Sequence, residues 1–218
     1  MLSLHGRKPA AAVAEPVAKL FLRAGLSANA VTVLGTLATV AVAIALIPRG
    51  HLVWAGALTA LFAAFDMIDG TMARIRGGGT AFGATLDASC DRLSDGALFG
   101  SIAYWLVFVD HAGKATVACA LVVLALSPTI SYIKARAEAG GLKVNGGLIE
   151  RPERLILALG GLFIEGLGVH GAIEVALWVL AAGSVFTVVQ RLVKASRDPN
   201  AGNRIAAPAG APEPKAAR

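Results

Sequence analysis

Long apolar runs separated by short polar connections dominate the sequence. The run from Val31 to Ile47 contains no charged residue, nor do residues 115–133 or 175–189. A helix needs roughly 20 mostly apolar residues to cross the ~30 Å hydrocarbon layer of a membrane. The pattern therefore predicts an all-α, polytopic integral membrane protein. We expect six transmembrane helices, at residues 29–48, 52–75, 81–109, 114–137, 153–169 and 171–193.

The two ends of the chain differ from this pattern. In residues 16–26, apolar and basic side chains fall on different faces of a helix, as in an amphipathic helix that lies in the membrane interface. One face carries Val17, Leu20, Phe21 and Ala24, and another carries Lys19 and Arg23. Residues 196–218 combine proline, glycine and alanine with scattered charge, which predicts a flexible cytoplasmic tail. We therefore expect one membrane domain over residues 1–195, with residues 1–28 as its N-terminal interfacial segment.

Composition and charge agree with this class and orient it. Hydrophobic residues make up 56% of the 218 positions and charged residues 16%, against about 25% charged in soluble domains. Of the 20 Lys and Arg residues, 17 lie in the N-terminus, the turn near residue 75, residues 134–154 or the C-terminus. The positive-inside rule then places both termini on the cytoplasmic side of the plasma membrane. The net charge of +6 can be explained by the membrane topology, by attraction to anionic membrane lipids, or by a pocket for anionic substrates. We expect no nucleic-acid partner.

The candidate chemistry lies in residues 66–91. Asp66 and Asp69 are spaced i, i+3, and Asp87 and Asp91 are spaced i, i+4, so each pair shares one helix face. One ionised side chain in the hydrocarbon costs at least about 2.5–3.5 kcal/mol, so four acids need compensation. The glycine-rich residues 76–83 can turn the chain back and bring the pairs together.

Oxygen ligands of this kind favour a hard cation, Mg²⁺ or Mn²⁺. Four carboxylates suffice for two ions, an arrangement suited to phosphoryl chemistry. Gly70 and Gly83 offer no side chain that would obstruct a ligand. The alternative is that Arg74, Arg76 and Arg92 only neutralise the acids. Cys90 and Cys119 lie in apolar segments and are interpreted as small core residues.

The aspartates belong to a longer pattern that resembles the motif of the CDP-alcohol phosphotransferases. Its eight fixed positions read Asp66-x2-Asp69-Gly70-x2-Ala73-Arg74-x8-Gly83-x3-Asp87-x3-Asp91. Residues 131–154 resemble the actinobacterial phosphatidylinositol phosphate synthases in particular. The resemblance covers most of the chain and implies a homodimer of six-helix subunits. It also implies transfer of the phosphatidyl group of CDP-diacylglycerol to 1D-myo-inositol 3-phosphate, with release of CMP.

The resemblance further implies roles for individual residues. Asp66, Asp69, Asp87 and Asp91 would bind the metal ions, and Asp91 would also be the catalytic base. CDP-diacylglycerol would contact Asn29, Ala30, Val31, Thr32, Asp66, Asp69, Gly70, Ala73, Arg74, Thr80 and Gly83. The acceptor phosphate would contact Ser131, Lys134, Arg154 and Arg191.

Several alternatives remain open at this stage. A phosphatidylglycerophosphate synthase, using glycerol 3-phosphate, would share the core motif and also require a basic pocket. An ion-coupled transporter is the alternative of another class, since membrane carboxylates also mark ion pathways. Asp95 extends the acidic stripe by one turn, and it either supports the site or pairs with an arginine. Arg136 and Arg151 are interpreted as interfacial anchors.

Overall fold

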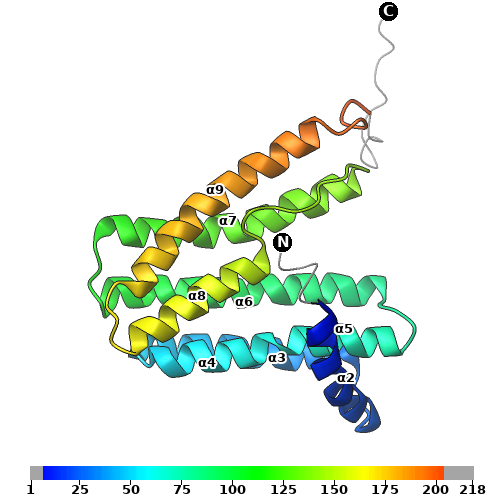
Figure 1. Ribbon diagram of the computed structural model, residues 1–218, viewed down its shortest axis with the longest axis horizontal. Helices are drawn as coiled ribbons and strands as arrows, with labels where there is room; N and C mark the ends of the chain where they lie inside the picture. The colour runs from blue at the N-terminus through cyan, green and yellow to red at the C-terminus, as the bar shows by residue number, and fades with distance from the viewer. Residues whose placement is uncertain (1–6, 204–218) are drawn as a thin grey trace, which may run out of the picture.

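The computed structural model describes residues 7–203, except for the side chains of residues 7–13 and of Asp66. This part of the chain is helical throughout, with turns between the helices and no strand (Figure 1). The α-helices are α2 (Arg7–Arg23), α3 (Ala28–Leu46), α4 (Leu52–Ala63), α5 (Phe65–Ile75), α6 (Ala81–Phe108), α7 (Lys114–Ala139), α8 (Arg151–Gly166) and α9 (Ala172–Ser196). A short 3₁₀ turn, η1 (Ile47–Arg49), follows α3.

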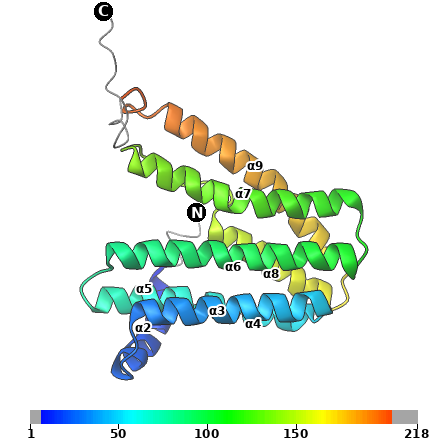
Figure 2. The ribbon, with the colours of Figure 1, turned by 180° about the vertical axis from the view of Figure 1, so that it is seen from behind.

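The connections between the long helices alternate between the two ends of the bundle (Figures 1 and 2). The turns at residues 76–80 and 140–150 lie at the end where α2 lies and α9 finishes. The turns at residues 47–51, 109–113 and 167–171 lie at the other end. The basic connections therefore share one end of the molecule, as the charge pattern predicts.

Each of the six segments expected to be a transmembrane helix is helical, with ends within a few residues of those predicted. The second is divided at Ala64 into α4 and α5. Among the described residues, four stretches are long and apolar enough to span a membrane: Ala28–Arg49, Leu52–Ile75, Lys114–Ala139 and Ala172–Ser196. α8 has only 16 residues, and α6 carries several charges between Asp87 and Asp95. The protein is thus a multi-pass membrane protein with at least these four candidate spans.

Small residues bring the helices together. A Cβ atom at Gly56 of α4 would lie 3.0 Å from the Leu159 carbonyl oxygen of α8. A Cβ atom at Gly161 of α8 would lie 2.9 Å from the Ala176 Cβ of α9. Such close approach is typical of helix packing in membranes, where dispersion contacts rather than water exclusion hold helices together. Large apolar side chains such as Leu37 point outward, as a surface that faces lipid requires.

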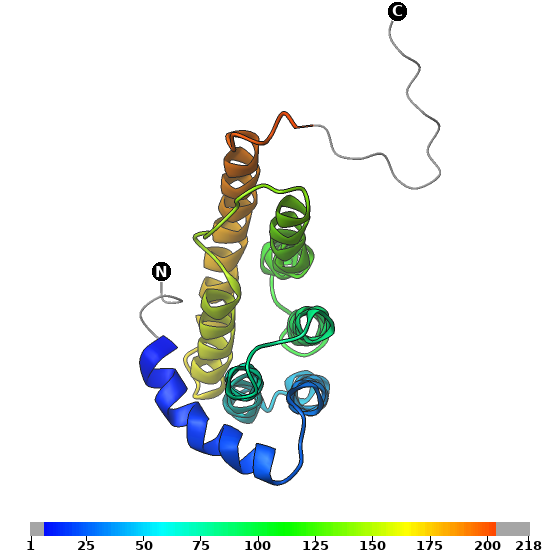
Figure 3. The same ribbon diagram turned by 90° about the vertical axis from the view of Figure 1, so that its right-hand side faces the viewer.

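The N-terminal helix differs from its prediction. It begins at Arg7 rather than at Pro16 and ends at Arg23. It lies across the bundle near α5 (Figure 3), and Ala18 is fully buried where it packs with Val31 and Met72. Leu20, predicted on the apolar face, is 61% exposed, as a side chain that faces lipid would be. The helix thus packs Ala18, Phe21 and Leu22 against the protein and leaves Leu20 facing outward.

A row of side chains on α9 and just beyond its end holds the connection between α7 and α8. The row contains Thr187, Arg191, Lys194 and Asp198, spaced three or four residues apart. Arg191 Nε donates to the Gly146 carbonyl at 3.2 Å, and Lys194 Nζ donates to the Asn145 carbonyl at 2.8 Å. Thr187 accepts from the Ile149 amide at 3.0 Å, and Asp198 accepts from the Lys143 amide at 2.9 Å. This connection delivers Arg151, the first residue of α8, to a fixed place.

Asp198 lies in the segment expected to be a flexible tail. The backbone amides of Lys143 and Asn200 hold the pKa of its carboxyl below the usual value for aspartate. The carboxylate is therefore charged at neutral pH, as its role as a double acceptor requires. The first part of the predicted tail is thus held to the 140–150 connection through Asp198, and residues 204–218 of the predicted tail lie outside the described part.

Gly147→Ala should destabilise the protein, because this connection lies so close to α9. The added Cβ would lie 2.7 Å from Thr187 Cγ2 and 3.5 Å from Arg191 Nε. Overpacking of this kind costs about 1–3 kcal/mol, which thermal unfolding of the detergent-solubilised protein would detect. Gly160→Ala in α8 is the matched control, since its Cβ would meet nothing within 4 Å. Equal thermal stability of the two variants would contradict the close packing.

Candidate active site

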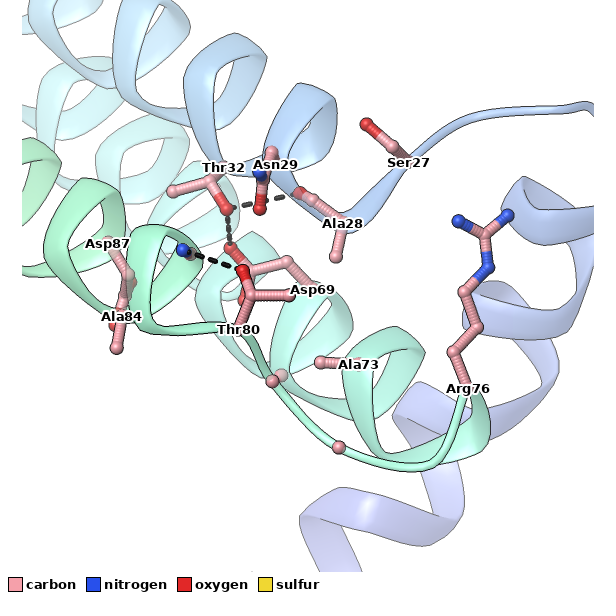
Figure 4. Close-up of a pocket in the computed structure, with 14 residues that line it drawn as sticks. Ser27, Ala28, Asn29, Thr32, Asp69, Ala73, Arg76, Thr80, Ala84 and Asp87 are labelled. Carbon is pink, nitrogen blue, oxygen red and sulfur yellow. Dashed lines mark hydrogen bonds between the residues drawn. The ribbon is translucent and has the colours of Figure 1, made fainter.

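A cavity of about 440 Å³ opens between α3, α5, α6 and the turn before α6 (Figure 4). All four of these elements supply lining residues. They are Ser27, Ala28, Asn29, Thr32, Asp69, Gly70, Ala73, Arg76, Gly78, Gly79, Thr80, Gly83, Ala84 and Asp87. Carboxylate, hydroxyl, amide and backbone groups thus meet in a space large enough for part of a nucleotide.

Two helix N-termini form one side of the cavity. Ser27 caps α3, and its hydroxyl accepts from the Ala30 amide at 3.1 Å. Thr80 caps α6 in the same way, accepting from the Gly83 amide at 2.9 Å. Polar caps of this type end the preceding turn and orient the first free amides of the helix. Because helix N-termini carry partial positive charge, the cavity suits an anionic group.

Asp69 is the most deeply placed acid of the cavity. Its side chain comes from α5 and is only 6% exposed. The hydroxyl of Thr32, on α3, donates to Asp69 Oδ2 (Figure 4). The same hydroxyl lies 3.1 Å from the Ala28 carbonyl, a second acceptor for its one proton. The hydroxyl therefore orients the carboxylate of Asp69 within the cavity.

Asp87, from α6, lines the same cavity as Asp69. The spacing argument from the sequence predicted this meeting of the two helices. Gly70 also lines the cavity, and a Cβ there would meet nothing within 4 Å. A side chain at position 70 would project into open space, so glycine keeps the face of α5 accessible. The donor set, oxygen-only and acidic, fits Mg²⁺ or Mn²⁺.

The described side chains do not complete a metal site by themselves. Outside Asp66, whose side chain is not described, no three His, Cys, Asp or Glu residues lie close enough to bind one ion. The sequence predicts Asp66 and Asp91 as the further ligands beside Asp69 and Asp87.

Asp91 lies one turn below Asp87, and arginines contact both of its oxygens. Arg151 Nη1, from α8, lies 2.8 Å from Asp91 Oδ1, and Arg92 Nη1 lies 3.1 Å from Asp91 Oδ2. Arg151 Nε is also 3.6 Å from Asp95 Oδ1. Asp95, whose role the sequence left open, pairs with arginines. Sequence reasoning missed the role of Arg151, which was interpreted as an anchor but reaches the catalytic candidate directly.

The four residues predicted to bind the acceptor phosphate lie on α7, α8 and α9. Arg154 is 1% exposed and donates from Nη2 to Asp95 Oδ2 at 2.8 Å. Its Nε and Nη1 have no hydrogen-bond partner among the described residues. Ser131 contacts the Ser127 carbonyl at 3.4 Å, and Lys134 lies 3.8 Å from Glu138.

Arg191 is 3% exposed and is engaged on every side. Besides the Gly146 carbonyl, it donates to the Ile130 carbonyl at 2.6 Å and to Glu150 Oε1 at 2.8 Å. Arg191 thus joins α7, α9 and the start of α8. Arg154 and Lys134, in contrast, have donor capacity left for an anion.

The lining includes most residues predicted to contact CDP-diacylglycerol, but not Ala30, Val31 or Arg74. Asp66, also predicted, has a side chain outside the described part. Val31 is buried between α2 and α5. Arg74 is exposed and donates to the Thr71 hydroxyl at 2.8 Å. Arg76 lines the cavity instead. α5 ends at Ile75, so Arg76 leaves the helical register and turns toward the cavity, which helix periodicity alone could not indicate.

Comparison with known proteins identifies the family. Residues 26–190 match the family model for CDP-alcohol phosphatidyltransferase. The chain belongs to the CDP-alcohol phosphatidyltransferase family. The matched region of this phosphatidyltransferase includes every residue of the cavity, and also Asp91, Arg151 and Arg154. The family resemblance predicted from the aspartate motif is thereby confirmed, and the transporter alternative loses its basis.

Individual relatives are similar over nearly the whole length. The phosphatidylinositol phosphate synthase of Corynebacterium glutamicum is 60% identical over 211 residues, covering 97% of this phosphatidyltransferase and 96% of the relative. A Mycobacterium tuberculosis phosphatidylinositol phosphate synthase with CDP-DAG bound has a similar structure, with TM-score 0.85 and 47% identity, covering 89% of this chain and 99% of that one. The same enzyme in complex with manganese and citrate gives TM-score 0.84 at 48% identity, covering 88% and 93%.

Proposed function

We propose that the protein transfers the phosphatidyl group of CDP-diacylglycerol to 1D-myo-inositol 3-phosphate, giving phosphatidylinositol phosphate and CMP. The observation that carries this proposal is the meeting of Asp69 and Asp87, from two helices, in one cavity with the capped N-termini of α3 and α6. Relatives named phosphatidylinositol phosphate synthase support the acceptor. A related structure with CDP-DAG bound supports the donor.

The metal ligands in this proposal are Asp66, Asp69, Asp87 and Asp91, and we propose two ions of Mg²⁺ or Mn²⁺. Divalent metal bound there neutralises the diphosphate and stabilises CMP as it leaves. A manganese complex of a related synthase supports a divalent ion. Asp69 is already oriented by Thr32, and Gly70 leaves the approach to it open.

The residues of the chain bind and orient the two substrates, and one of them accepts a proton. The CDP group occupies the cavity, where Asn29, Thr80 and Gly83 lie beside it and Arg76 offers positive charge. The acceptor hydroxyl oxygen attacks the phosphorus that bears diacylglycerol, and the bond from that phosphorus to CMP breaks. Asp91 accepts the hydroxyl proton. Because a carboxylate is a weak base for an alcohol, positioning and electrostatic stabilisation supply most of the acceleration.

The acceptor phosphate lies, in this proposal, against Ser131, Lys134, Arg154 and Arg191. Arg154 offers two buried N–H groups to which the described residues give no acceptor. Buried donors without partners are costly, so an incoming phosphate oxygen would relieve that cost. Guanidinium groups bind phosphate through two parallel hydrogen bonds.

We also infer the surroundings of the enzyme from its charge pattern. Six transmembrane helices, with α2 in the membrane interface, would place both termini and the cavity on the cytoplasmic side of the plasma membrane. The basic end of the bundle supports this orientation through the positive-inside rule. Assembly as a homodimer remains a prediction from the family resemblance.

Arg154→Lys tests the acceptor assignment without removing the charge that faces Asp95. Loss of the planar fork should raise KM for inositol phosphate about ten- to hundredfold, the equivalent of about 1.5–3 kcal/mol. KM for CDP-diacylglycerol should hardly change, because its cavity lies on other helices. CMP release with inositol phosphate, glycerol 3-phosphate, inositol and serine is the measurement.

The matched control is Arg136→Lys, on the exposed surface of α7. Wild-type acceptor kinetics in Arg154→Lys would contradict the phosphate site. A higher kcat/KM for glycerol 3-phosphate than for inositol phosphate would instead assign the protein to the phosphatidylglycerophosphate synthases.

A further inference from the structure

Arg151 lies within reach of two acids, the metal-binding candidate Asp91 and the buried Asp95. It is the first residue of α8, and its side chain reaches Asp91 and Asp95, which lie one turn apart on α6. The guanidinium is 21% exposed, while the side chains of Asp91 and Asp95 are 17% and 5% exposed. Water therefore screens these interactions only in part.

Asp95 provides a second place for this guanidinium. Its Oδ2 accepts from Arg154 Nη2 at 2.8 Å. Its Oδ1 is buried and accepts no hydrogen bond from the described residues, although Arg151 Nε lies only 3.6 Å away. A buried carboxylate oxygen without a donor is costly, and a small shift of Arg151 would supply one.

Asp91, in contrast, has arginine contacts on both oxygens. A divalent cation that binds Asp91 would approach the positive charge of Arg151 at close range. Like charges at a partly buried site repel strongly, so the ion and the guanidinium compete for the same carboxylate. Because Asp95 lies within reach, Arg151 can give up Asp91 without losing all carboxylate contact.

We propose that Arg151 is the counter-ion of Asp91 in the metal-free protein, and that Asp95 receives its guanidinium when a divalent cation takes Asp91. The proposal rests on the metal site of the proposed function. It makes Arg151 and Asp95 positioning residues that set the affinity of the ion. After the exchange, one carboxylate, Asp95, is shared by Arg151 and Arg154, so positive charge remains at the start of α8 for an anionic acceptor.

Binding of Mn²⁺ to the full chain in detergent, without either substrate, tests the exchange. The electron paramagnetic resonance signal of free Mn²⁺ measures the dissociation constant directly. Arg151→Gln should bind Mn²⁺ about tenfold more tightly, because the charged hydrogen bond from Arg151 to Asp91 no longer competes with the ion. Arg151→Lys keeps the charge and should stay within about threefold of the wild type. Arg136→Gln, on the exposed surface of α7, should leave the affinity unchanged.

Asp95→Asn should act in the opposite direction and weaken Mn²⁺ binding about threefold, because the acid that would receive Arg151 then carries no charge. In the Arg151→Gln background the same substitution should have no effect, since it acts through Arg151. A loss that persists there would indicate general damage and overturn the role of Asp95. If Asp95→Asn does not fold, the two Arg151 variants decide the proposal alone.

The outcomes separate this inference from the proposed function. Failure of the wild type to bind Mn²⁺, or full binding by Asp69→Asn, would overturn the metal site itself. Normal wild-type binding that Asp69→Asn abolishes, with no tightening in Arg151→Gln, would overturn only the counter-ion exchange. Equal tightening by Arg151→Gln and Arg151→Lys would overturn it too, since the cause would then be side-chain shape rather than charge.

Discussion

Asp69→Asn is expected to reduce phosphatidyl transfer by at least about a thousandfold. The substitution keeps the size of the side chain and its contact with Thr32 but removes the negative charge. Asp69 is the buried acid of the cavity and faces it together with Asp87. An amide oxygen is a much weaker ligand for a hard cation than a carboxylate. Release of CMP from CDP-diacylglycerol, with inositol phosphate as acceptor, measures the loss.

Asp110→Asn is the matched control, because Asp110 is exposed in the connection between α6 and α7 at the opposite end of the bundle. It should keep wild-type activity. Chelation gives an independent result: excess EDTA should stop the wild-type enzyme, and added Mg²⁺ or Mn²⁺ should restore it. Transfer at the full rate in EDTA, or substantial activity in Asp69→Asn, would exclude the metal mechanism.

The meeting of Asp69 and Asp87 could be predicted from sequence because helix periodicity is a local property. Acids spaced three or four residues apart share a face, and a glycine-rich turn between two apolar helices brings those faces together. The helices of the bundle could be predicted for the same reason, since the length of an apolar run indicates the length of the helix. The break at Ala64 could not, because neither proline nor glycine marks it.

The role of Arg151 depends on how α8 packs, and no local pattern contains that information. An arginine at the start of a membrane helix is most simply interpreted as an interfacial anchor. One signal was available: Asp91 and Asp95 are one turn apart, and so are Arg151 and Arg154. Two acids and two arginines with matching spacing suit two facing helices. The sequence does not state that α6 and α8 face each other, and the structure supplies that fact.

For Cys90 and Cys119, residue type and apolar sequence surroundings are enough to predict burial. Both are buried and free, as small core residues should be. For the N-terminal helix they are not enough. Leu20 and Phe21 are both large and apolar, but Phe21 packs toward α5 beside Ala18, whereas Leu20 is exposed. Which of the two faces the protein depends on how α2 packs on α5, and composition does not contain that information.

Asp91→Asn is expected to separate turnover from donor binding. Turnover should fall about 10²- to 10⁴-fold, the usual contribution of a positioned base. The affinity for CDP-diacylglycerol should stay within about threefold of the wild type, because Asp69 and Asp87 line the cavity and Asp91 does not. Equilibrium binding of CDP-diacylglycerol in the presence of Mn²⁺, and single-turnover CMP release, measure the two quantities separately.

Asp87→Asn provides the matched comparison, one turn away on the same helix. Its carboxylate faces the cavity, so donor affinity and turnover should fall together. If donor affinity in Asp91→Asn falls as far as its turnover, Asp91 acts mainly as a metal ligand and another group takes the proton. Comparison of the two variants therefore tests whether neighbouring turns of α6 have different roles, with Asp87 holding the donor and Asp91 activating the acceptor.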